Sequence, residues 1–189
     1  MSTKPPTTLH PTTTLHPLTT LTGTHPLTIG PSTYIHLRAH LNTTHAPLTI
    51  HGYCIIGEKS VIGIQEVKEG GEEKEGGEAG GDKVELQSHI TIGPNAIIQA
   101  SSIGTGTIIG VGARIGKGAV VGSYCKINPL CTVAAYETIP DHTVIYGYNE
   151  RRIDRGSSSS SGGMEAFRRK AVEQQVEVLR RAEGAARRK

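Results

Sequence analysis

The feature that most constrains the fold is a six-residue repeat in the second half of the chain. From Ile109 to Val144, six consecutive hexads run without interruption, and each opens with a β-branched aliphatic residue. A helix repeats every 3.6 residues and a half-buried strand every two, so neither explains an aliphatic side chain at every sixth position. A hexapeptide solenoid does, because three hexads make one three-sided coil and the openers of successive coils stack inside it. The openers are Ile109, Ile115, Val121, Ile127, Val133 and Ile139.

The fifth residue of each hexad fits the same architecture, because it also points inward, near a corner where space is short. Five of the six are small, and Glu137 is the exception. We therefore expect the cysteines to fill the core, and three cysteines without a CxxC spacing favour a reducing compartment. The small residues are Ala113, Ala119, Cys125, Cys131 and Thr143, and Cys54 has the same place in an earlier hexad.

The repeat extends towards the N-terminus. Leu9, Leu15, Leu21 and Leu27 lie six residues apart within a Thr/Pro-rich segment that otherwise suggests low complexity. The frame then shifts by two residues, slips by three at 47–49, and loses one residue near 104–106. The sequence thus predicts an all-β fold, a parallel β-helix of about six coils over residues 9–150, after a disordered N-terminus at 1–8.

Residues 65–88 interrupt the repeat. This segment holds eight acidic residues and three lysines, with glycine pairs and almost nothing apolar. Such a composition cannot bury enough surface to order itself. We expect an acidic, flexible loop insertion there.

The C-terminal segments leave the six-residue period. Residues 151–163 form a Ser/Gly-rich linker, and residues 164–189 show the 3.6-residue period of an amphipathic α-helix. We expect this helix to cover a flank of its own domain or of a partner rather than a membrane. Its predicted apolar stripe is Phe167, Ala171, Val172, Val176, Leu179 and Ala182.

Charge and hydropathy exclude some function classes. The formal net charge of +3 does not favour a nucleic-acid partner. The chain has neither a run of about 18 apolar residues nor a basic segment followed by an apolar one at its start. We therefore expect no direct membrane insertion and a cytoplasmic location.

Two enzymatic functions are alternatives for this architecture: a hexapeptide-repeat acyltransferase and a trimeric zinc enzyme like the γ-class carbonic anhydrases. Zinc would need three convergent histidines. His40 and His45 lie five residues apart, but no third histidine lies at a matching distance upstream, and His45 falls at an inward position. Four other early histidines each follow a hexad opener, so the repeat itself explains them: His10, His16, His36 and His51.

Acyl transfer would need a histidine general base. His89 and His142 are the candidates near the later coils, and Asp141 is the one acid beside either of them. An acid next to a turn residue more often serves the turn. We therefore assign no catalytic, cofactor-binding or metal-ligating residue, expect no cofactor, and expect the chain not to be an enzyme.

Several stretches resemble the dynactin subunit 6 family, of which the chain would be a divergent member. They are RAHLNTTHAPLTIHGYCIIGEKSVI at 38–62, the short coil SSIGTGTIIG at 101–110, and the ending YCKINPLCTVAAYETIPDHTVIYGYNERR at 124–152. The most specific piece is IPDHTVIYG, followed by Arg151 and Arg152. The resemblance covers roughly residues 21–152; the N-terminal segment and the acidic loop depart from the family.

This resemblance implies a left-handed β-helix and a non-catalytic structural subunit of the dynactin pointed-end complex. It implies pairing with dynactin subunit 5, another β-helix, beside the pointed-end actin-related protein and the large zinc-binding dynactin subunit. Such a hetero-oligomer supports dynein-driven cargo transport on microtubules, in the cytoplasm and on the cytoskeleton. We further hypothesise that the coils over 109–145 present a rigid face to the partner β-helix.

Overall fold

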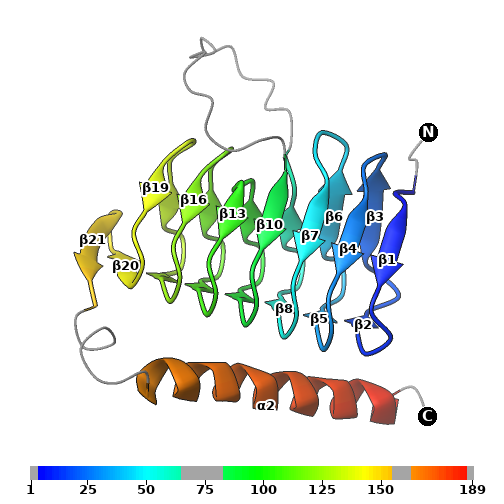
Figure 1. Cartoon of the computed structure of the whole chain (residues 1–189). Coiled ribbons are helices and arrows are strands. Elements are labelled where there is room, and N and C mark those ends of the chain that lie inside the picture. Colours follow the sequence, from blue (N-terminus) through cyan, green and yellow to red (C-terminus); the bar gives the residue numbers. More distant parts are fainter. Residues whose placement is uncertain (1–3, 65–82, 155–162, 187–189) are drawn as a thin grey trace.

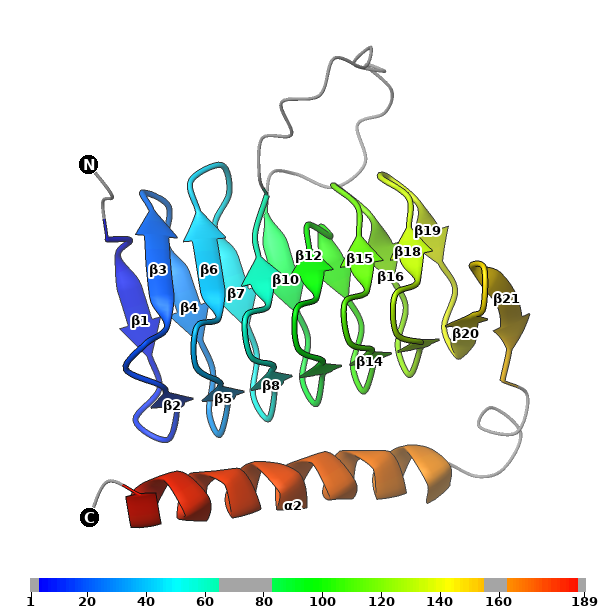
Figure 2. The ribbon, with the colours of Figure 1, turned by 180° about the vertical axis from the view of Figure 1, so that it is seen from behind.

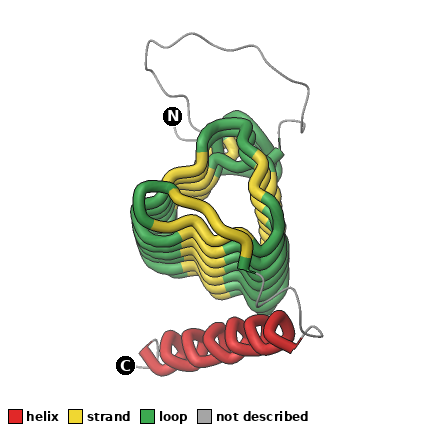
Figure 3. Tube along the Cα trace, turned by 90° about the vertical axis from the view of Figure 1, so that its left-hand side faces the viewer, coloured by secondary structure: helices red, strands yellow, loops and turns green. Residues whose placement is uncertain are grey.

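The computed structural model describes residues 4–64, 83–154 and 163–186. Their strands form three sheets, here named A, B and C, which close a three-sided prism (Figures 1 and 3). Sheet A contains β1 (Thr7–Leu9), β4 (Leu27–Ile29), β7 (Leu48–Ile50), β10 (Val84–Leu86), β13 (Ser102–Ile103), β16 (Val120–Val121) and β19 (Thr138–Ile139). Sheet B contains β2 (Thr14–Leu15), β5 (Tyr34–Ile35), β8 (Ile55–Ile56), β11 (Thr91–Ile92), β14 (Ile108–Ile109), β17 (Lys126–Ile127), β20 (Thr143–Tyr146) and β21 (Glu150–Ile153). Sheet C contains β3 (Thr20–Gly23), β6 (His40–Thr43), β9 (Val61–Ile62), β12 (Ile97–Ile98), β15 (Arg114–Ile115) and β18 (Thr132–Val133).

The hexad openers form the core. In sheet B, Ile92 pairs in parallel register with Ile56 on one side and Ile109 on the other, and all three are buried. Each such side chain contributes about 2 kcal/mol on burial, so a stacked ladder replaces the aromatic core that the chain lacks. The inward small residues are also buried, including all three cysteines, which are free thiols. The prediction of a left-handed parallel β-helix of about six coils is confirmed.

The frame shifts fall at one corner of the prism, the turn from sheet C to sheet A. This C–A corner is lengthened between β3 and β4, between β6 and β7, and between β9 and β10. The missing residue belongs there too, because Ile98 in β12 and Ile103 in β13 are only five apart, whereas Ile103 and Ile109 keep the spacing of six. Its predicted place at 104–106 was therefore wrong.

The acidic insertion falls in the sequence between β9 and β10, the two strands that flank this corner. Residues 65–82 lie outside the described residues, but the prediction that the loop runs to residue 88 differs from the structure. Val84 and Leu86 are buried in β10, which pairs with β7 and β13. Two aliphatic residues flanking Glu85 give the inward alternation of a strand, and this local pattern outweighs the acidic composition around it.

The β-helix extends beyond its predicted bounds at both ends. At the N-terminal end, Thr7 and Thr8, expected to be disordered, pair with β4. At the C-terminal end, residues 151–153, expected in the linker, form β21, which pairs antiparallel with β20. Arg151 forms an ion pair with Glu137, and Arg152 lies over the Tyr146 ring, 5.8 Å from its centroid. The hairpin thus covers a sheet end that would otherwise present unpaired backbone groups.

The helix α2 (Gly163–Ala186) lies along sheet B of its own β-helix (Figures 1, 2 and 3). Val172 and Val176 are buried against Ile55, with Leu179 packed beside them. The rest of the predicted stripe is rotated away, since Phe167 is 69% exposed and Ala171 and Ala182 are exposed too. Polar contacts described below fix this orientation. No helix in the described residues is long and apolar enough to cross a membrane.

Candidate functional site

The sequence singled out His89 and His142. Both lie in turns at the corner of the prism where the chain passes from sheet A to sheet B. Each occupies the left-handed turn position of this A–B corner, with φ of 61° and 58°. Histidine is among the residues that tolerate this backbone region. Each ring stacks on the tyrosine one coil below: His89 on Tyr53 at 5.1 Å between centroids, and His142 on Tyr124 at 5.6 Å. The corner therefore holds two aromatic pairs in fixed orientation.

Glycine separates the two pairs. Gly106 occupies the same turn position between His89 and Tyr124, with φ of 70°. A Cβ on this residue would lie 2.6 Å from the Tyr124 ring, so the ring needs the space that glycine leaves.

Both histidines meet a glutamate from α2. The Nε2 atom of His89 lies 2.9 Å from Oε1 of Glu173, and Nε2 of His142 lies 3.5 Å from Oε1 of Glu165. The His89 side chain is 13% exposed, and its buried Nδ1 has no hydrogen-bond partner within the described part of the chain. The tautomer with the hydrogen on Nε2 donates to Glu173 and buries a lone pair at Nδ1, which is less costly than burying an unpartnered N–H there.

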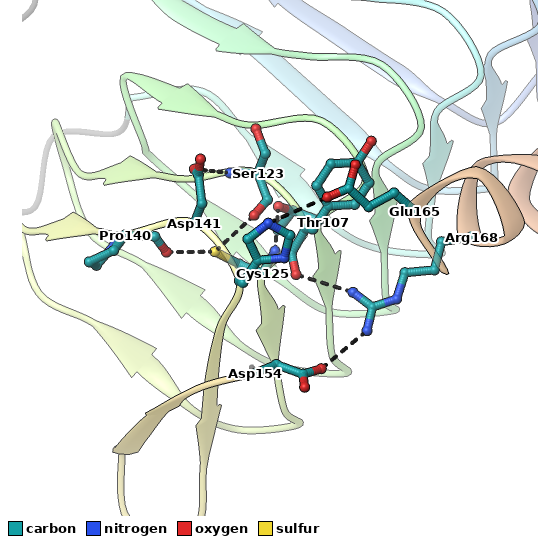
Figure 4. Close-up of polar contacts among 10 residues, drawn as sticks. Thr107, Ser123, Cys125, Pro140, Asp141, Asp154, Glu165 and Arg168 are labelled. Atoms are coloured by element: carbon teal, nitrogen blue, oxygen red, sulfur yellow. Dashed lines mark hydrogen bonds and ion pairs between the residues drawn. The ribbon is translucent and has the colours of Figure 1, made fainter. Parts of the chain in front are cut away.

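Arg168 and Tyr34 make further polar contacts between α2 and the β-helix. Arg168 donates from Nη1 to the backbone oxygen of Tyr124 at 3.3 Å and from Nη2 to Asp154 at 3.4 Å (Figure 4). Near the other end of α2, the hydroxyl of Tyr34 donates to Glu183 at 2.6 Å. The helix is therefore held by polar contacts along its length, with only a short apolar seam between them.

A small apolar pocket lies between α2 and sheet B. It has a volume of 330 Å³ and is lined by Ile108, Phe167, Ala171 and Val172, with His89 at its wall. A histidine paired with a carboxylate beside an apolar pocket is the arrangement that general acid–base chemistry uses. Here Nε2 is engaged by Glu173 and Nδ1 is buried, so proton transfer requires the ring or the helix to move.

Asp141, the acid beside His142, serves its turn as expected. Its Oδ1 accepts the backbone N–H of Ser123 at 2.7 Å (Figure 4). The nearby Cys125 thiol donates to the backbone oxygen of Pro140 at 3.1 Å, and burial raises its pKa. Burial also raises the pKa of the Cys54 thiol, to about 12. These two cysteines are thus held as thiols rather than as nucleophilic thiolates.

The histidines considered for zinc are not brought together. His40 faces outward, where its Nε2 lies 2.7 Å from the Thr22 hydroxyl and burial lowers its pKa. His45, predicted to point inward, is exposed instead, because the lengthened corner puts Ala46 in the buried position. Among residues 4–64, 83–154 and 163–186, no three His, Cys, Asp or Glu side chains are placed to hold a metal ion.

Sequence reasoning missed the partners that α2 supplies. Glu165, Arg168 and Glu173 belong to a helix recognised only by its apolar stripe. No sequence signal links Glu173 to His89 across 84 residues. The helical spacing of the three does place them towards one side of the helix, and this was the available clue.

Comparison with known proteins gives the fold and no closer relationship. No family model and no curated protein matches the chain. Among solved structures, a hexapeptide transferase family protein from Anaplasma phagocytophilum matches with a TM-score of 0.69 and 12% identity, covering 92% of this chain and 91% of that one. A Bacillus cereus protein described as a candidate acetyltransferase matches with a TM-score of 0.65 and 15% identity, covering 91% and 92%.

These neighbours correct one expectation. The sequence led us to expect that the chain is not an enzyme, and that prediction is wrong in light of them, because both are named for group transfer and share the fold over more than 90% of their length. At such low identity the likeness establishes the fold alone. The chain has the hexapeptide-repeat β-helix fold of these proteins.

Proposed function

We propose that this chain is a docking subunit that pairs with another β-helix, dynactin subunit 5, in the dynactin pointed-end complex. The observation that carries the proposal is a rigid sheet face, at the C-terminal coils, bordered by exposed apolar residues on both sides. This is sheet C around β15 and β18, on a different side of the prism from α2 (Figure 2). A flat face with an apolar border is suited to a second flat face.

Leu130 forms one border of this face. It lies in the turn from sheet B to sheet C, its side chain is 80% exposed, and Val111 is exposed one coil below. A Cβ on Gly112 would lie 2.9 Å from a Leu130 methyl group, so the leucine rests on the glycine below it. Bulky apolar side chains that the fold already holds in place lose little entropy on binding.

Tyr136 forms the other border, at the C–A corner. Its side chain is 55% exposed, and its ring covers Gly118, where a Cβ would lie 2.6 Å away. Between the two borders, sheet C presents Arg114 and Thr132, both exposed. Tyrosine and arginine are enriched where protein interfaces have their strongest contacts.

The residues that carry the family resemblance support the same face. IPDHTVIYG, with Arg151 and Arg152, builds the closing hairpin through the Glu137–Arg151 ion pair and the Tyr146–Arg152 contact. Asn149, in the hairpin turn, accepts the backbone N–H of Thr132 in β18 at 2.7 Å. The motif therefore fixes the last coil of the proposed face.

The wider assignment follows the resemblance and belongs to the proposal. It places the chain beside the pointed-end actin-related protein and the large zinc-binding subunit, in a hetero-oligomer that acts with dynein on microtubules. Cytoplasmic and cytoskeletal location goes with it.

Co-expression with dynactin subunit 5 tests the proposal. We expect a stable heterodimer, which Leu130→Glu weakens by about 30-fold, since burying an unpaired charge within an interface costs about 2 kcal/mol. Leu18→Glu is the matched control, because Leu18 occupies the same corner in an N-terminal coil and is 57% exposed. Equal effects of both substitutions, or no heterodimer, would refute the assigned face.

Acyl transfer is the second candidate function, favoured by the names of the two neighbours and by the His89–Glu173 pair beside the apolar pocket. Release of free thiol from acetyl coenzyme A measures it directly. If His89 is the general base, His89→Gln lowers turnover at least 100-fold, whereas His10→Gln, in the same corner of the first coil, leaves turnover unchanged. Docking does not depend on the absence of this activity.

A further inference from the structure

A second pocket adjoins the apolar one, and the two share Arg168. The second pocket has a volume of 480 Å³ and lies between the C-terminal end of sheet B, the closing hairpin and α2. Arg168 lines both pockets. One continuous surface of α2 therefore joins an apolar recess to a polar one.

The second pocket is positively charged. Lys126, Arg152 and Arg168 line it, together with the single carboxylate of Asp154. Asp154 pairs with Arg168, whereas neither Lys126 nor Arg152 has an ion-pair partner among the described residues. Three cations and one carboxylate leave an excess of two positive charges in a recess with partly buried walls.

The remaining walls suit hydrogen bonding to an anion. The half-buried Asn128 and Tyr146 line the recess, and Val144 is buried in its wall. Arg152 lies against the Tyr146 ring, which restricts the guanidinium to the side of the recess. Guanidinium, ammonium and amide groups together form the donor set that phosphate oxygens accept from.

We propose that this double pocket binds an amphiphilic phosphomonoester, with its phosphate among Lys126, Arg152 and Asn128 and its aliphatic arm over Ile108 and Ala171. A phosphomonoester carries between about −1.5 and −2 charges at neutral pH, which matches the excess of two positive charges better than one carboxylate does. The adjoining recess of 330 Å³, lined by Ile108, Phe167, Ala171 and Val172, accepts the arm. This inference is independent of pairing with another β-helix, because the double pocket lies on sheet B, whereas the proposed docking face is on sheet C.

Calorimetric titration of the whole chain with octyl phosphate tests the proposal. We expect octyl phosphate to bind at least 10-fold more tightly than inorganic phosphate, which lacks the arm, and than octyl glucoside, which lacks the charge. Lys126→Gln combined with Arg152→Gln should weaken the binding of octyl phosphate at least 10-fold. Lys117→Gln is the control and should leave this affinity unchanged, because Lys117 is exposed at the C–A corner. Ala171→Glu should remove the advantage of octyl phosphate over inorganic phosphate. Because Lys126 and Arg152 are exposed, we expect the double variant to keep the melting temperature of the wild type, and this measurement confirms that it is folded.

Vesicles distinguish a soluble ligand from a lipid. Retention on phosphatidylcholine vesicles that contain phosphatidic acid, lost in the double variant, assigns the phosphate to a membrane lipid. Octyl phosphate binding without such retention assigns it to a soluble ester. Equal affinity of the wild type and the double variant for octyl phosphate, or equal affinity for octyl phosphate and octyl glucoside, overturns the proposal.

Discussion

The Nε2 atom of His89, at the A–B corner between β10 and β11, lies 2.9 Å from Oε1 of Glu173 on the C-terminal helix. The two residues are 84 positions apart in sequence, and their contact fixes which side of α2 faces sheet B. Among the described residues of α2, the apolar side chains buried against sheet B are Val172 and Val176, so the polar contacts carry a large share of the docking.

Glu173→Gln should therefore loosen α2. The neutral amide replaces a carboxylate that accepts from a nearly buried histidine, at a cost of about 1 kcal/mol. We expect amide hydrogen exchange over residues 172–179 to accelerate about fivefold. Glu177→Gln is the control, since Glu177 pairs with Arg180 and Arg181 within the helix. If both variants exchange like the wild type, the His89 contact does not hold the helix.

The alternation within β12 predicts unequal costs for two neighbouring isoleucines. Ile98 is fully buried in the prism, whereas Ile97 faces outward and is half-buried. Ile98→Ala should lower the free energy of unfolding by about 3 kcal/mol, and Ile97→Ala by less than about 1 kcal/mol. Urea denaturation measures both, and equal losses would place the strand in the wrong register.

Thermal stability should fall on acidification. Burial lowers the pKa of His36 and of His40 below the ordinary histidine value of 6.5, so the unfolded chain binds protons that the folded chain does not. The contribution of these two histidines to the free energy of unfolding is therefore fully present above about pH 6.5 and declines as the pH falls towards the lowered pKa values. His40→Gln should flatten this slope between pH 7 and 5. A melting temperature that rises over that range would contradict the burial of these rings.

Glu85 adds to the same trend at lower pH. Its pKa is lowered by hydrogen bonds from Lys83 and then from His51, with burial opposing them. That contribution to stability is present above pH 4.5, the ordinary pKa of a glutamate, and is lost as the pH falls through the lowered pKa. Lys83→Gln should remove part of the decline below pH 4.5 in the same melting series.

The buried thiol of Cys54 should resist alkylation. With its pKa raised to about 12 by burial, and the thiol donating to the backbone oxygen of Gln87 at 3.1 Å, almost no thiolate forms at pH 8. We expect mass spectrometry to show iodoacetamide on Cys54 only after denaturation. Rapid labelling of the native protein would contradict this expectation, because it would show that the Cys54 side chain is accessible to solvent.

The repeat made the fold predictable, because a buried aliphatic at every sixth position, such as Ile109 or Ile115, admits one simple stacking scheme. The corners were less predictable. The openers Leu41 and Ile50 are nine residues apart, which marks a lengthened turn but not which of its residues points inward, and there Ala46 is buried and His45 is exposed. Local composition also misled where Val84 and Leu86 continue the core from within an acidic segment.

The candidate site was predictable only in part. Position in the repeat singled out His89 and His142, but their partners come from a helix whose orientation depends on long-range polar contacts. The apolar stripe alone predicted that Phe167 faces the core, and the pairing of Glu165 and Glu173 with the two histidines turns it outward.

The most direct test of the docking proposal is the mass of the particle that the purified chain forms when mixed with dynactin subunit 5, measured by light scattering after gel filtration. We predict a one-to-one heterodimer that Leu130→Glu dissociates. A homotrimer of the chain that does not bind subunit 5 would contradict the docking proposal.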